Sequence, residues 1–266
     1  MPPERPRIAL VVAGRAVGSV EPDDARLLAR EVADVFLDDH GLSLGDEALD
    51  DGGGSAGRDE ASHALARMAR VLRDAGRLGP WRDEVLPVLA DDDAMLGVVE
   101  RAAARALGLR TIAVHLLGWG ADGRMWVQRR APDKAVDPGL LDTLAGGMVA
   151  ALGAPGDFRI EDLADAMRRE ADEEAGVPPD APMRRLEERP LRIARPVAEG
   201  YMVEDLVGFE ARLAAGFAPF NRDGEVAAFE CLAPETLLER IGGGEFTLEA
   251  SLLILERLRR GERAGS

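Results

Sequence analysis

The stretch Arg169-Glu170-Ala171-Asp172-Glu173-Glu174-Ala175-Gly176-Val177 places three glutamates within one turn of a predicted helix and then ends that helix with a glycine. On a helix, Glu170, Glu173 and Glu174 stand at positions i, i+3 and i+4, so they share one face. Like charges this close repel one another unless a multivalent cation lies between them. The stretch therefore predicts a divalent-metal site, and with it chemistry on a phosphate-bearing substrate.

The composition narrows the class of protein. The chain has 266 residues, 46% of them hydrophobic, which is enough for one large domain or two modest ones. Its formal net charge of −16 argues against non-specific binding to nucleic acid and against docking on an anionic membrane. The single cysteine, Cys231, rules out an internal disulfide framework. With no signal-like start and no run of membrane-spanning length, we expect a cytoplasmic protein.

The first third of the chain has the pattern of a small α+β unit. A helix opening at Pro22 is expected to place Leu27, Leu28, Val32 and Phe36 on one face. The Gly- and Asp-rich segment 41–60 is expected to be a surface loop. Asp91-Asp92-Asp93 is expected to cap a helix that runs to Leu107. The other elements expected in this part are strands at 7–12 and 16–20, a helix at 61–75 and an extended segment at 81–89.

The second part begins near residue 110 and is expected to hold a sheet with helices. Residues 120–123 form a hairpin signal between two strand-like runs, and the acidic stretch belongs to a predicted helix over 161–175. The expected strands are 111–119, 124–129, 192–197, 202–213 and 225–232, and two closing helices are expected at 234–241 and 248–260.

The acidic stretch also resembles a known signature. Its order is R-E-aliphatic-x-E-E-x-G-aliphatic, Glu161 stands eight residues before Arg169, and Gly146-Gly147 lies upstream. This resembles the box of the Nudix hydrolases, a superfamily that cleaves diphosphates linked to another moiety. The leading glycine of that box departs from the pattern, because the spacing places it at Pro155. We therefore expect a loop rearranged by a residue or two, with the metal ligands kept.

The resemblance implies roles for the acidic stretch. Glu170, Glu173 and Glu174 would be ligands of Mg²⁺ or Mn²⁺, which prefer oxygen donors. The metal would lower the pKa of an attacking water, and Glu173 would double as the base that accepts its proton. Arg169 would hold the carboxylates in place. A glutamate-rich helix is more often a solvated face, but the fixed order, the helix-ending glycine and the upstream Gly-Gly favour the metal site.

The similarity reaches beyond the box to a Nudix subgroup that carries an extra amino-terminal domain and is labelled thiamin-pyrophosphokinase-related. It implies an accessory α+β domain at 1–108 and a Nudix domain at 109–266, built as a mixed sheet between helices. It also implies a substrate, thiamin diphosphate or an oxidised analogue. The segments that carry the similarity include 81–85, 99–103, 108–111, 138–142 and 221–226.

A local positive cluster is predicted to contact the diphosphate. Arg129 and Arg130 leave a strand, and Lys134, the only lysine of the chain, follows in the loop. In an acidic protein such a cluster is a natural phosphate clamp, with ordinary surface charge as the alternative. Lys134 is the residue we expect to make the contact.

Four further residues complete the predicted site. Many Nudix enzymes recruit a carboxylate from a late loop, and Glu225 is the candidate here, with Asp223 in reserve; an exposed turn is the alternative. Gly146, Gly147 and Trp119 are expected to bind substrate, Trp119 by stacking on a thiazolium or a base.

Three alternatives remain beside the thiamin hypothesis. One is a housecleaning hydrolase of nucleoside diphosphates. Another is an inactive Nudix fold used as a binding module, although such proteins typically lose box carboxylates. The third, an isopentenyl-diphosphate isomerase, is disfavoured because the thiol it needs is absent where Leu144-Ala145-Gly146 stands. The expected partner is a small-molecule diphosphate, and the chain is expected to be a monomer or homodimer. His115 is expected to be a partnered core histidine.

Overall fold

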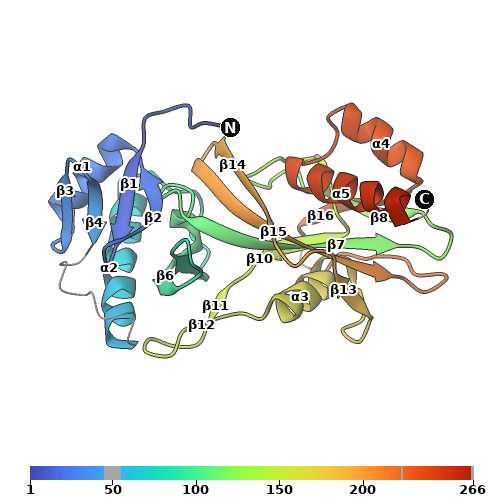
Figure 1. The fold of residues 1–266 in the computed structure, drawn as a ribbon, viewed down its shortest axis with the longest axis horizontal. Coiled ribbons are helices and arrows are strands. Elements are labelled where there is room, and N and C mark those ends of the chain that lie inside the picture. Colours follow the sequence, from blue (N-terminus) through green and yellow to red (C-terminus); the bar gives the residue numbers. More distant parts are fainter. Residues whose placement is uncertain (45–54, 223, 265–266) are drawn as a thin grey trace. The chain divides into compact units, whose positions relative to one another are not determined.

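The computed structural model describes residues 1–44, 55–222 and 224–264 (Figure 1). Contacts between residues divide the chain into two compact units. The first comprises Met1–Thr111, Val149–Glu161 and Ile193–Glu204, and the second comprises Ile112–Met148, Asp162–Arg192 and Asp205–Ser266. The expected division into two domains, at 1–108 and 109–266, concerns which parts fold independently, and it stays a prediction. Residues 45–54 of the expected 41–60 loop lie outside the described residues. The prediction is wrong for its two ends, because 41–44 pair in strand β4 and 55–60 belong to helix α2.

The first unit contains a four-stranded sheet with the order β2-β1-β4-β3, in which β1 and β4 are parallel. Its buried residues, among them Leu10, Leu28 and Leu65, form one core with the two helices. The elements are β1 (Ile8–Val12), β2 (Arg15–Val20), α1 (Pro22–Glu31), β3 (Val35–Asp38), β4 (Gly41–Leu44) and α2 (Ser55–Asp74).

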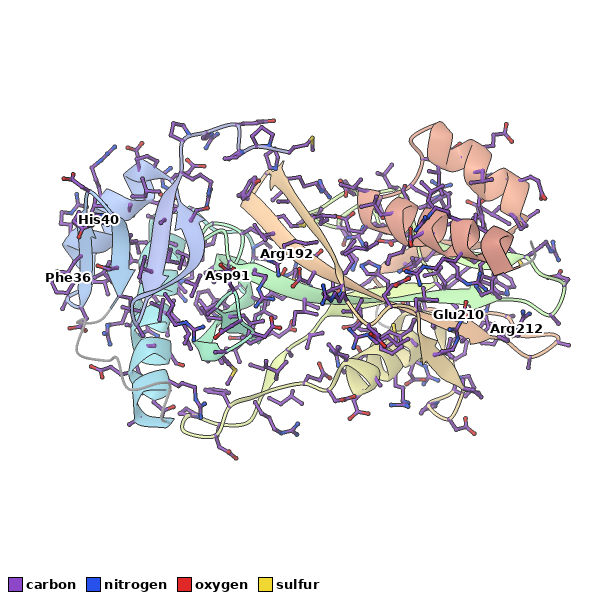
Figure 2. All side chains as sticks on the ribbon, viewed as in Figure 1. Phe36, His40, Asp91, Arg192, Glu210 and Arg212 are labelled. Atoms are coloured by element: carbon purple, nitrogen blue, oxygen red, sulfur yellow. The ribbon has the colours of Figure 1, made fainter. Side chains whose placement is uncertain are left out.

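Helix α1 is shorter than the sequence pattern predicts. Leu28 and Val32 are buried as expected, but the helix ends at Glu31, and Val32 already has extended backbone. Phe36 belongs instead to β3, the outer strand of the sheet, where its side chain is 59% exposed (Figure 2). The prediction that Phe36 lies on the buried face of the helix is wrong, because pairing of β3 with β4 outweighs the helical spacing.

The helix expected after Asp91-Asp92-Asp93 is also wrong. This segment is a hairpin of β5 (Val85–Leu89) and β6 (Met95–Glu100), followed by the 3₁₀ turn η2 (Arg101–Ala103). The aspartates form its turn: Asp93 has φ of 68°, and Asp92 accepts a hydrogen bond from the N–H of Ala94. Aspartate is equally suited to a turn and to a helix cap, so the pairing of β6 with β5 decides between them.

Among the residues that the structure describes, the larger sheet has eight strands. Its main order is β13-β15-β7-β8-β16, with β10 paired to β7, β14 to β15 and β9 to β8. The sheet is mixed: β7 and β8 are antiparallel, whereas β7 and β15 run the same way, since Thr111 bonds Val203 and Leu213 bonds Trp119. The strands are β7 (Arg110–Trp119), β8 (Met125–Arg130), β9 (Leu141–Asp142), β10 (Ala145–Met148), β13 (Met183–Arg185), β14 (Leu191–Val197), β15 (Gly200–Arg212) and β16 (Val226–Leu232).

A short hairpin of β11 (Ala151–Leu152) and β12 (Arg159–Ile160) replaces the expected glycine loop of the box. Gly153 and Gly156 both have positive φ in this hairpin, at 116° and 93°. The turn is therefore built by the two glycines that flank Pro155. Glu161 follows it, buried, and its carboxylate accepts the N–H of Ala150.

Helix α3 (Leu163–Ala175) carries the acidic stretch and packs against β10 (Figure 1). It begins after Asp162, whose carboxylate accepts the N–H groups of Ala164 and Asp165. It ends at Gly176, which has the left-handed conformation, with φ of 62° and ψ of 28°. Helices α4 (Pro234–Gly242) and α5 (Leu248–Ala264) close the chain. The expected mixed sheet with helices is confirmed.

Candidate functional site

Glu174 is the most buried carboxylate of the acidic stretch, with 1% of its surface exposed. Its Oε2 atom accepts two hydrogen bonds, from Gln128 Nε2 at 2.9 Å and from the backbone N–H of Gly146 at 2.8 Å. Its Oε1 atom faces Lys134, whose Nζ lies 3.9 Å away. One oxygen is thus held by fixed donors, and the other is directed toward a cation.

Burial raises the pKa of Glu174 to about 7. The positive charge of Lys134 opposes that rise in pKa, the nearby charge of Glu170 adds to it, and the hydrogen bonds from Gly146 and Gln128 oppose it. A group with such a pKa gains strongly from a nearby cation, because the cation compensates for the water that burial removes.

Glu170 lies on the same side of α3, against β10. A Cβ atom placed on Gly147 would come within 2.1 Å of the Glu170 carboxyl carbon, so any larger residue would require this carboxylate to shift. Arg169 Nη1 donates to Glu170 Oε1 at 2.7 Å. Gly146 therefore donates its N–H to Glu174, and Gly147 leaves the space that the Glu170 carboxylate occupies.

Glu173 takes a different position. Its side chain is 47% exposed and lies 3.5 Å from Arg169. Within residues 1–44, 55–222 and 224–264, no three His, Cys, Asp or Glu side chains are grouped closely enough to hold a metal ion as they stand. The predicted common face thus brings Glu170 and Glu174 together, while Glu173 stays at the solvent edge.

Lys134 links Glu174 to the late loop. Its ammonium forms an ion pair with Glu225, whose own backbone carbonyl accepts the N–H of Ala131. The fold thus brings Glu225 to the same lysine that faces Glu174, although 51 residues separate the two glutamates. Asp223, the reserve candidate, lies outside the described residues.

Arg129 and Arg130 are engaged with the loop that carries Lys134. Arg129 donates to the carbonyl of Gly139 at 2.9 Å and pairs with Glu230. Arg130 donates to the carbonyl of Val136 through two nitrogens and to Asp142 at 3.0 Å. In this arrangement their side chains hold the ends of the loop, while Lys134 reaches the acids.

Trp119 stands at the far end of β7, where the guanidinium of Arg257 lies 5.8 Å from its ring centroid. It is four residues beyond His115, the partner of Gly146 across the sheet, which is about 13 Å along a strand. His115 is buried, and its Nδ1 is 3.2 Å from Thr143 Oγ1, as expected of a core histidine.

Sequence reasoning did not find the role of Gln128. It is a buried amide in the middle of β8, and it donates to Glu174 from 46 residues away. The available signal was a polar residue within an apolar strand, since a buried amide needs a hydrogen-bond partner.

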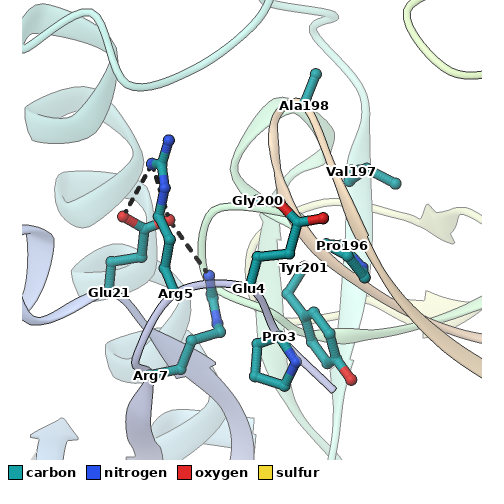
Figure 3. A pocket seen from close by; sticks show the side chains of 10 residues that line it. All are labelled: Pro3, Glu4, Arg5, Arg7, Glu21, Pro196, Val197, Ala198, Gly200 and Tyr201. Atoms are coloured by element: carbon teal, nitrogen blue, oxygen red, sulfur yellow. Dashed lines mark hydrogen bonds and ion pairs between the residues drawn. The ribbon is translucent and has the colours of Figure 1, made fainter. Parts of the chain in front are cut away.

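A separate cavity of about 340 Å³ lies within the first unit (Figure 3). Arg5 and Arg7 line it, and both face the carboxylate of Glu21. The charges of Arg5, Arg7 and Glu21 are therefore paired with one another. Among the described residues no helix combines the length and apolar character needed to cross a membrane.

A family model, a sequence relative and a solved structure all relate this chain to the same family. The family model described as NUDIX domain matches residues 109–249. A Nudix hydrolase of Deinococcus radiodurans is 30% identical over 168 residues, which are 63% of this chain and 90% of the relative. A crystal structure from the same organism matches with a TM-score of 0.51 and 25% identity, covering 65% of this chain and 98% of that one.

Plant relatives are longer. Chloroplastic Nudix hydrolase 20 of Arabidopsis thaliana is 28% identical over 187 residues, which are 65% of this chain but 46% of the relative. This chain therefore spans about half the length of these relatives.

Proposed function

Because this chain belongs to the Nudix family, we propose that it hydrolyses a diphosphate bond with the help of a divalent cation held against α3. Members of the family generally use divalent metal ions. The observation that carries the proposal is Glu174: a carboxylate that is buried, held on one oxygen by two donors and turned toward a positive charge on the other. Such an arrangement places negative charge where a cation stabilises it most.

The residues present fit a hard cation such as Mg²⁺ or Mn²⁺. Glu170, Glu174 and Glu225 offer carboxylate oxygens, the donors that these ions prefer, and Gly147 leaves the space that Glu170 needs. The metal would neutralise the diphosphate oxygens and lower the pKa of a bound water. Because no three acids of the described residues are grouped closely enough as they stand, the side chains of these three would have to converge to hold the ion. Arg169 would orient Glu170 through its hydrogen bond.

Glu173 is proposed as the general base. Its half-exposed side chain can meet a water that enters from solvent, and a base needs hydrogen-bond reach to the proton it accepts. The predicted ligand role of Glu173 and its role as base are separable by experiment. Glu173→Gln should lower kcat and alter its pH dependence while metal affinity stays near that of the wild type. A large loss of metal affinity in this variant would assign Glu173 to the metal instead.

For the substrate we propose thiamin diphosphate or an oxidised analogue, cleaved to the monophosphate and phosphate. The support is the similarity of the segments outside the box to the thiamin-pyrophosphokinase-related subgroup. A nucleoside diphosphate is the alternative, since the acidic site recognises the diphosphate and leaves the other moiety open.

The test is phosphate release from thiamin diphosphate, its oxidised analogues and a set of nucleoside diphosphates, each with Mg²⁺, with Mn²⁺ and with EDTA. We expect metal-dependent turnover, fastest on a thiamin compound. Faster turnover of a nucleotide would assign the housecleaning alternative. Tight binding of diphosphates with no turnover under any metal would show a binding module and refute the hydrolase.

A further inference from the structure

The ammonium of Lys134 lies beside two carboxylates that the proposed function assigns to a metal ion. Lys134 forms an ion pair with Glu225 and stands 3.9 Å from Glu174 Oε1, the oxygen not used by Gln128 and Gly146. Its side chain is only 19% exposed, so its charge is poorly hydrated and is stabilised in part by these two acids. A single positive charge thus lies against two carboxylates that the proposed function assigns to a divalent ion.

Hydrogen bonds tie the backbone around Lys134 at several points, so its side chain is the part best able to change partners. Arg129 and Arg130 hold the loop at Gly139 and Val136, and the Lys134 N–H donates to the carbonyl of Ala131 at 3.2 Å. The flexible four-carbon stem of lysine lets its ammonium change partners within such a fixed loop.

The presence of a lysine rather than an arginine at position 134 supports a positive charge that can change partners. Of the 33 basic residues, Lys134 is the only lysine. An arginine would bind a carboxylate in a bidentate fork, which is harder to release, whereas an ammonium is a compact point charge like a small cation. A divalent ion bound by Glu174 and Glu225 would repel the ammonium from both acids.

We propose that Lys134 is an internal counter-cation that pairs with Glu174 and Glu225 while no metal is bound, and that metal binding releases it to contact the diphosphate. The inference rests on the proposed function, because it concerns the same metal and the same substrate. It makes Lys134 a competitor of the metal and a ligand of the substrate. Removing its charge should therefore raise the affinity for the metal and lower the affinity for the diphosphate.

The first experiment uses the unmodified chain. Because the sequence has one lysine, protein labelled with ¹³C-lysine gives a single Cε signal in an NMR spectrum. Titration with Mg²⁺, without substrate, should shift that signal to saturation at the concentration at which calorimetry detects metal binding. A signal that stays in place while Mg²⁺ binds would overturn the inference and leave the proposed function intact. If calorimetry detects binding of neither Mg²⁺ nor Mn²⁺, both are overturned.

The second experiment compares Lys134→Met with Lys134→Arg. Without substrate, K134M should bind Mn²⁺ about tenfold more tightly than the wild type, because the competing charge is gone, while K134R should not bind more tightly. In turnover, K134M should show a KM for the diphosphate raised by about tenfold. A merely structural lysine would weaken both affinities on removal, and that result would refute the exchange.

Discussion

Two acidic runs in this chain have similar composition and different surroundings. Asp91-Asp92-Asp93 forms an exposed hairpin turn, in which Asp92 is 65% exposed and pairs with Arg15 at the surface. In α3, by contrast, Glu174 is buried and held by Gln128 and the backbone of Gly146. Both runs concentrate negative charge, but in the first run water already solvates the carboxylates.

The difference teaches that a dense acidic run does not make a metal site. Water screens the aspartates of the turn, so a cation gains little there. Around Glu174 water is largely excluded, and fixed donors orient the carboxylate before any ligand arrives. The same contrast appears within α3, where Glu173 lies at the solvent edge and Glu174 lies inside.

The largest effect should come from Glu174→Gln. The amide keeps the size of the side chain but carries no charge, so phosphate release with Mg²⁺ should fall well over tenfold, which is more than about 1.4 kcal/mol of transition-state stabilisation. Asp92→Asn, the matched change in the turn, should leave kcat/KM unchanged. Wild-type activity in E174Q, or an equal loss in both variants, would remove the distinction between the two runs.

A smaller loss is expected from Gly147→Ala. The added Cβ must push the Glu170 carboxylate away, and displaced orienting contacts typically cost about tenfold in metal affinity or activity. Gly242→Ala is the control, because a Cβ there meets nothing within 4 Å. Calorimetry with Mn²⁺ and kcat/KM measure the effect. An unchanged metal affinity in G147A would mean that the position of Glu170 is unimportant.

The helix that carries the site should depend on its amino-terminal cap. Asp162→Ala removes the acceptor of two backbone N–H groups and should lower the free energy of unfolding by about 1 kcal/mol. Asp165→Ala, in the first turn of α3, removes an exposed pair with Arg168 and a charge near the helix amino terminus but no cap acceptor, and should change it less. Urea unfolding compares the variants, and equal destabilisation would contradict the cap.

An effect on stability no larger than that of the cap concerns Glu210, a partly buried and paired acid in β15 (Figure 2). Burial raises its pKa, but hydrogen bonds from Arg257 and Arg184 outweigh burial and leave the pKa below the ordinary 4.5. Its contribution to stability is therefore complete above pH 4.5 and is lost as the pH falls through the lowered pKa.

Glu210→Gln tests that pH dependence. At pH 7 the variant should be less stable than the wild type by about 1 kcal/mol, and the difference should vanish in acid. Exposed Glu239→Gln serves as the control. Urea unfolding at pH 7, 5 and 3 provides the measurement, and a pH-independent difference would show that the charge of Glu210 is not the cause.

Local patterns predicted most of the elements because their causes are local. Asp162 and Gly176 end α3 through their own side chain and backbone, and the strands of the larger sheet follow their apolar runs. Prediction failed where two local structures suit the same residues. Asp91–Asp93 suits a cap or a turn, and only pairing of β6 with β5 selected the turn.

The features of the site likewise divide into those that local spacing predicted and those that depend on the fold. Spacing along a helix predicted that Glu170 and Glu174 face one side. It did not predict that Glu173 stays at the surface, or that Gln128 holds Glu174. The metal, substrate and base roles of these residues remain predictions.

The sequence by itself determined the acidic helix, its two ends, the family resemblance and the presence of one lysine among many arginines. Only the tertiary structure decided which glutamate is buried, which backbone N–H it accepts and that Lys134 lies between Glu174 and Glu225. The physical reason is that burial and charge pairing depend on groups far apart in the chain, which a folded sheet brings together, whereas helix caps and periodicity depend on neighbours.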